Sequence, residues 1–99
     1  MAIRVTEMNA SDEITIRAQV RDYSFRVLDP DDCRGILTGD KPVTDQQEAM
    51  FVEAIHPENC ETRSLTELEP GDRAVFLVGR HRIKKLTTST IREIVWGTL

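Results

Sequence analysis

The feature that most constrains the fold is an apolar run at residues 74–78, Ala-Val-Phe-Leu-Val, set between two turn signals. Pro70-Gly71-Asp72 precedes the run and Gly79 follows it. A short apolar run bounded by such turns is typical of a buried β-strand. We therefore predict a β-hairpin that reverses at Gly79-Arg80 and returns through residues 81–86.

The register of this hairpin follows from the two-residue turn. It places Phe76 opposite Ile83 and Val78 opposite His81. A glycine at the first turn position favours the connection, because glycine readily adopts the positive φ that this turn type requires.

Two alternating runs nearer the N-terminus predict a second hairpin. Apolar side chains occupy the even positions of residues 14–20 and the odd positions of residues 23–27. Since side chains alternate between the two faces of a strand, one continuous strand would expose the second apolar set. A reversal at Arg21-Asp22 removes this conflict. The expected pairs are then Val20 with Tyr23, Ala18 with Phe25, and Ile16 with Val27.

The remaining segments are less regular. Residues 3–5 suit a short opening strand, residues 29–42 a loop with at most a short strand, and residues 57–64 a polar loop. Residues 43–55 fit either a helix or a strand, and we favour a strand at 49–55 because every neighbouring element is β. Residues 87–96 are rich in β-branched and aromatic types and suit a final strand, although Thr90 and Glu93 also have the spacing of a helix capping box.

These elements predict one mainly β domain over residues 1–99. The expected form is a small antiparallel barrel or two-layer sheet, SH3-like or OB-like in outline, with at most one short helix within 43–55. A chain of 99 residues is too short to build two stable cores. Trp96, in the apolar final strand, is expected in the core in preference to an interface.

Positive charge gathers in the 74–86 hairpin of a chain whose net charge is −4. Such a cluster can contact phosphate groups, bind an acidic protein, or guard a strand edge against aggregation. No aromatic residue lies between the cations, whereas barrels that bind single-stranded nucleic acid usually stack bases on aromatic rings. The candidate residues for binding a partner or a phosphate are Arg80, Arg82, Lys84, Lys85 and Arg92.

No pattern indicates a metal, a cofactor or a catalytic group. Residues 29–40 carry carboxylates at calcium-loop offsets, but Cys33 and Arg34 occupy the positions that need a ligand and a glycine. The soft ligands of the chain are Cys33, Cys60, His56 and His81, and no paired motif preorganises them for zinc. The same residues form no recognisable nucleophile motif. We expect neither a metal, nor a cofactor, nor enzymatic activity.

The resulting hypothesis is a non-enzymatic binding or regulatory module that uses an exposed strand edge or the basic segment 80–85. The expected partner is a protein, which includes a second copy of the chain. Binding of nucleic acid is the alternative, and a thiol- or metal-dependent enzyme is a third. No apolar stretch approaches the roughly 20 residues that cross a bilayer, and two cysteines are too few for a disulfide framework. We therefore expect a cytoplasmic protein without membrane contact.

Overall fold

The computed structural model describes residues 2–39, 46–79 and 84–98 of the chain. The fold is mainly β, as predicted, and β5 confirms the strand expected at 49–55; the one helical element in these ranges is a short 3₁₀ turn. In chain order the elements are β1 (Ile3–Arg4), η1 (Val5–Glu7), β2 (Asp12–Ala18), β3 (Asp22–Asp29), β4 (Arg34–Gly39), β5 (Gln47–Ile55), β6 (Thr62–Ser64), β7 (Glu67–Leu68), β8 (Arg73–Val78), β9 (Lys84–Thr87) and β10 (Ile91–Thr98).

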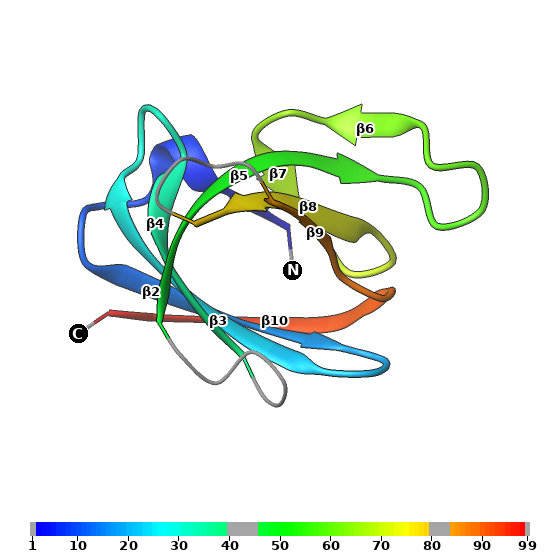
Figure 1. Cartoon of the computed structure of the whole chain (residues 1–99), viewed down its shortest axis with the longest axis horizontal. Helices are drawn as coiled ribbons and strands as arrows, with labels where there is room; N and C mark the ends of the chain where they lie inside the picture. Colours follow the sequence, from blue (N-terminus) through cyan, green and yellow to red (C-terminus); the bar gives the residue numbers. More distant parts are fainter. Residues whose placement is uncertain (1, 40–45, 80–83, 99) are drawn as a thin grey trace.

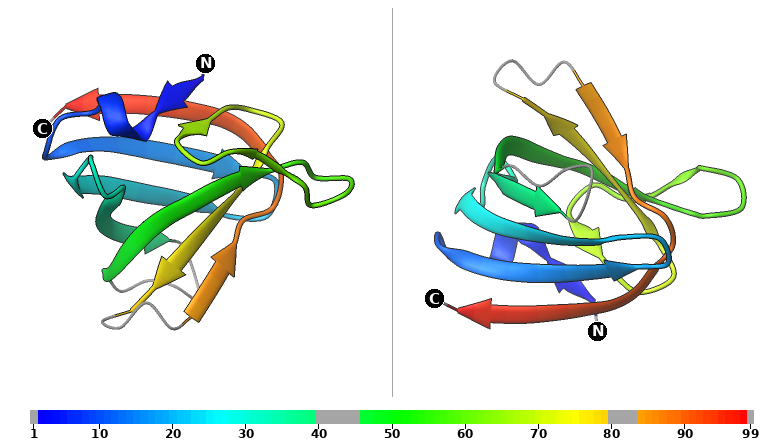
Figure 2. Two further views of the ribbon diagram at one scale, coloured as in Figure 1. Left: turned by 90° about the horizontal axis from the view of Figure 1, so that it is seen from above. Right: turned by 60° about the horizontal axis from the view of Figure 1, so that its bottom comes forward.

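One antiparallel sheet contains most of these strands, in the order β10-β2-β3-β4-β5-β8-β9, with β6 paired to β5. The sheet bends until its two halves form two layers (Figure 1). Its end strands, β9 and β10, do not pair with each other in the described ranges, and they diverge from their short connection (Figure 2). The two-layer alternative of the prediction therefore fits the structure, whereas a closed barrel is not confirmed.

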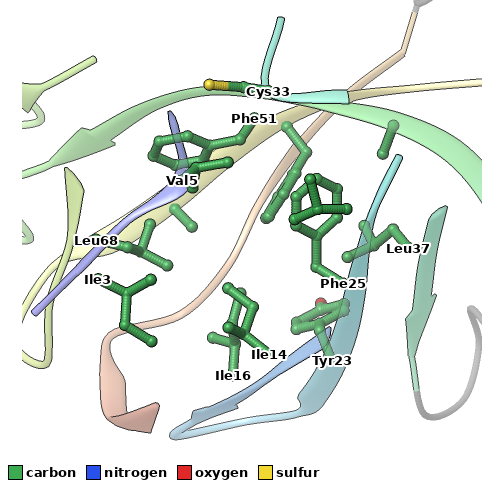
Figure 3. Packing of buried hydrophobic residues seen from close by; sticks show 14 of the residues in the cluster. Ile3, Val5, Ile14, Ile16, Tyr23, Phe25, Cys33, Leu37, Phe51 and Leu68 are labelled. Carbon is green, nitrogen blue, oxygen red and sulfur yellow. The ribbon is translucent and has the colours of Figure 1, made fainter. Parts of the chain in front are cut away.

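Three phenylalanine rings pack in the space between the layers. The ring centroids of Phe25 on β3 and Phe76 on β8 are 5.2 Å apart, and those of Phe51 on β5 and Phe76 are 5.7 Å apart. The separate β1–β7 ribbon covers part of the same interior with buried side chains (Figure 3). Other members of this core are Ile3, Val5, Ile14, Ile16, Tyr23, Leu37 and Leu68.

The first predicted hairpin exists, but its turn and register are wrong. The N–H of Ala18 donates to the oxygen of Arg21 at 3.1 Å, so the turn residues are Gln19 and Val20. Ile16 accordingly faces Tyr23, and Ile14 faces Phe25. The observed and the predicted registers differ by an even number of residues. The apolar side chains of both strands therefore still lie on the face that was predicted to be buried.

Two hydrogen bonds between the turn and a distant segment explain where this turn forms. The N–H of Gln19 donates to the oxygen of Thr90 at 3.0 Å, and the N–H of Val20 donates to the hydroxyl of Ser89 at 3.0 Å. The side chain of Val20 is 73% exposed. Long-range contacts, absent from any local pattern, therefore set the reversal two residues earlier than expected.

The second predicted hairpin also exists with a different register. Phe76 lies opposite Leu86 and Val78 opposite Lys84, so the predicted pairing of Phe76 with Ile83 and of Val78 with His81 is wrong. Gly79 has a φ of 99°, as its turn position suggested. Its N–H donates to the oxygen of Glu48 at 2.8 Å, so Gly79 continues beside β5, and Arg80 of the predicted turn lies outside the described residues.

The segment 88–90 joins the two ends of the sheet and is not part of a strand or helix. Thr88 is completely buried there. Its hydroxyl accepts the N–H of Ala74 at 3.0 Å and donates to the oxygen of Ser89 at 2.8 Å, while its own N–H donates to the oxygen of Ala74 at 2.9 Å. Thr88 thus continues the pairing of β8 where β9 ends, and the final strand starts only at Ile91.

We expect Thr88→Val to destabilise the fold by about 1–3 kcal/mol, because it leaves the buried N–H of Ala74 without an acceptor while preserving side-chain shape. Urea unfolding followed by circular dichroism measures this change. Thr88→Ser keeps the hydroxyl and is expected to lose clearly less stability than Thr88→Val. Equal losses in the two variants would show that packing, and not the hydrogen bond, is what Thr88 contributes.

Candidate functional site

The basic residues singled out in the sequence do not form one described cluster. Arg80 and Arg82 lie outside the described residues, as does His81. Lys84 and Lys85 are exposed on β9, and their side chains leave opposite faces of the strand because they are consecutive. Arg92 is exposed on β10, at the other end of the strand order. The three candidate cations that the structure describes are therefore divided between the two ends of the strand order.

The acidic residues of 29–35 lie at the end of β3, which is Asp29, and in the turn that joins β3 to β4. The guanidinium of Arg34 lies 3.1 Å from the carboxylate of Asp29 and 3.7 Å from that of Asp32. The hydrogen bond from Arg34 lowers the pKa of Asp29 below its ordinary value. A depression of about 330 Å³ lies beside this turn. In the part of the chain that the structure describes, no group of three metal-ligating side chains comes together.

A second ion-pair group, which the sequence analysis missed, holds the 62–72 segment. Arg63 donates to the buried carboxylate of Asp72 at 2.6 Å and lies 3.2 Å from a carboxylate oxygen of Glu67 and 3.8 Å from one of Glu69. Burial alone lowers the pKa of Arg63, but the bonds to Asp72 and Glu67 outweigh it, so its pKa lies above the ordinary value. Three carboxylates face this one guanidinium, which ties β6 to the 67–72 segment, so we assign the group a structural role.

The two cysteines are free and lie in different environments. Cys33 is buried in the β3–β4 turn, and burial raises the pKa of its thiol. Cys60 is exposed in the turn after β5, where its N–H donates to the oxygen of His56 at 3.0 Å. The raised pKa of Cys33 is the opposite of what a reactive nucleophile needs.

The border strands of the main sheet, β6, β9 and β10, differ in length and charge. β9 has four residues and begins with Lys84 and Lys85, the kind of short, charged edge that resists pairing with another chain. β10 has eight residues, and its segment 94–97, Ile-Val-Trp-Gly, carries no charge. Figure 2 shows β10 as the outermost strand of its layer. The long edge is therefore the one without this protection.

The first hairpin fixes the direction of the backbone groups next to β10. Since the N–H of Ala18 donates to Arg21, the N–H and C=O of Ala18 face β3. These groups alternate in direction along a strand, so those of Thr15 face β10. Thr15 pairs with Val95, and the N–H and C=O of Val95 consequently face β2.

The same alternation turns the N–H and C=O of Ile94 and Trp96 away from the sheet. At the start of the strand, the 71–72 turn occupies this outer side: Ile91 donates to the oxygen of Asp72 and accepts from the N–H of Gly71, both at 2.8 Å. Beyond Ile91, no backbone hydrogen bond from another described segment reaches β10 from outside. Among the described residues, the outward N–H and C=O groups of β10 therefore have no backbone partner from residue 92 onward, and we call this side the open edge.

Two apolar side chains flank the open edge on opposite faces. Trp96 lies opposite Ile14 on the face that carries the core, and Val95 lies opposite Thr15 on the outer face. Trp96 is 43% exposed and Val95 is 42% exposed. The expectation of a core tryptophan is therefore wrong, because Trp96 stands at the border of the sheet, where no further strand of the described chain covers it.

No protein-family profile matches the chain, and comparison with curated proteins and with solved structures gives no significant match. None of the helical segments that the structure describes is long and apolar enough to cross a membrane.

We expect Cys60 to react with a chromogenic disulfide reagent at least about tenfold faster than Cys33, because burial of Cys33 both excludes the reagent and raises the thiol pKa. Absorbance then rises in a fast and a slow phase. Cys60→Ser is expected to remove the fast phase, and Cys33→Ser the slow one. A fast phase that survives in Cys60→Ser would contradict the burial of Cys33.

Proposed function

We propose that this chain is a non-enzymatic binding or regulatory module that takes up an extended segment of another polypeptide at the open edge of β10. The observation that carries the proposal is the outward direction of the N–H and C=O groups of Ile94 and Trp96 on an eight-residue edge strand whose segment 94–97 carries no charge. An added strand pairs with such groups in the binding mode known as β-augmentation.

The energetics of this edge support binding. Each backbone hydrogen bond to an added strand contributes about 0.5–1.5 kcal/mol net, since the groups exchange water for the partner. Trp96 supplies a large ring beside the added strand, and tryptophan is enriched among the residues that dominate binding energy. Val95 offers a smaller apolar contact on the other face of the sheet.

A protein partner fits the described residues better than nucleic acid does. Tyr23, Phe25, Phe51 and Phe76 are buried and cannot stack on bases. The exposed aromatic ring of the described chain, Trp96, lies on β10, away from Lys84 and Lys85 on β9. We further propose a cytoplasmic setting, because an exposed free thiol such as Cys60 suits a reducing compartment.

A selection from a displayed library of random ten-residue peptides on the immobilised protein tests this proposal. Selected peptides are expected to bind Trp96→Pro about tenfold or more weakly than Trp96→Ala, a difference of at least about 1.4 kcal/mol. Both variants lose the ring, but proline also removes the outward N–H. That N–H makes no bond to β2, so the fold is expected to tolerate proline there.

Thermal melting of both variants controls for folding. Peptides that bind Trp96→Pro and Trp96→Ala equally well would place the binding surface elsewhere. A selection that enriches no peptide above background would count against the proposal as well.

A further inference from the structure

We infer that the polypeptide bound at this edge is β10 of a second copy of the chain. The two β10 strands run antiparallel about a two-fold axis that passes between the two Val95 residues, so that the two sheets continue into one. This inference rests on the proposed function, because it names the partner of the same edge.

The direction of the backbone groups fits this register. With Val95 opposite Val95 of the second copy, Ile94 of each copy faces Trp96 of the other. Both residues turn N–H and C=O outward, so the pair can exchange hydrogen bonds in both directions. The two-fold symmetry repeats the same exchange, and each copy satisfies the groups that the other leaves open.

The side chains also match about this axis. The Val95 side chains meet on the outer face, and Ile94 meets Trp96 of the second copy on the face that carries the core. Charged residues do not oppose each other, since Glu93 falls opposite Gly97 of the second copy. A two-fold axis at Glu93 would instead set two carboxylates against each other, and one at Ile94 would set Glu93 against Val95.

The short, charged strand β9 at the other end of the sheet also favours a pair of copies. A sheet with two open edges could add copies without limit, whereas Lys84 and Lys85 on the short β9 oppose further addition. The other border strands are poor templates, since β9 begins with Lys84 and Lys85 and β6 has only three residues, so assembly is limited to a closed pair. A single pair of edge strands buries less than the roughly 1,200 Å² of standard interfaces, so we expect a weak dimer with a Kd on the order of 10 µM.

Sedimentation equilibrium over protein concentrations from micromolar to near-millimolar tests the inference with charge-swapped variants. Val95→Lys and Val95→Glu each set like charges together on the two-fold axis, and each is expected to weaken the dimer at least tenfold. An equimolar mixture of the two sets opposite charges together and is expected to restore dimers. Val95 is exposed in the monomer, so neither change disturbs the core.

Leu28→Lys is the matched control, because Leu28 is exposed on β3, inside the strand order and away from both edges. This variant is expected to dimerise as the unmodified chain does. Dimers that persist in Val95→Lys would overturn the register, and failure of the mixture to dimerise would overturn the contact between the two Val95 residues.

A chain that remains monomeric at all concentrations overturns the second-copy inference. The peptide selection then separates the two proposals. Selected peptides that distinguish Trp96→Pro from Trp96→Ala would uphold strand addition with a different partner, whereas peptides that do not would remove both.

Discussion

The contact between Phe25 and Phe76 is the interaction on which the rest of the structure depends. One sheet must cover both sides of its own core, and it does so by bending until β3 and β8 bring these two rings within 5.2 Å between their centroids. Phe51 and the β1–β7 ribbon then complete the interior. The main sheet bends around this packing, and its strand order leaves β10 and β9 at its two ends.

The open edge is a direct consequence of how the sheet ends. Thr88 uses its backbone and its hydroxyl to continue the pairing of β8, and Thr90 accepts from Gln19. The backbone of segment 88–90 is therefore bonded to β8 and to the β2–β3 turn. From this segment β9 and β10 run in different directions (Figure 2). A sheet closed by pairing β9 with β10 would leave no free backbone groups on the outer side of β10. The open one keeps the outer side of residues 92–98 available for another strand.

Much of the fold could be predicted from local alternation, and the registers could not. The period-two pattern identified the buried faces of β2 and β3 because a shift by an even number of residues preserves them, even though the turn lies at Gln19-Val20 and not at Arg21-Asp22. Leu86 takes the place opposite Phe76 that was expected for Ile83, and the bond from Gly79 to Glu48, a contact with β5, has no signal in the local pattern. The position of a strand within the sheet is a long-range property. The apolar pattern of the last strand gives no sign that this strand lies at the border, so it predicted a buried Trp96. The role of the basic residues in binding a partner or a phosphate stays a prediction.

Amide hydrogen exchange, measured by NMR at low and at high protein concentration, tests the central claim most directly. The outward amides of Ile94 and Trp96 are expected to exchange fast in dilute solution and slowly in concentrated solution. The amide of Val95, which faces β2, is expected to be slow in both. If Ile94 and Trp96 are as protected as Val95 in dilute solution, the edge is not open. If they stay fast at every concentration, the edge does not pair with a second copy.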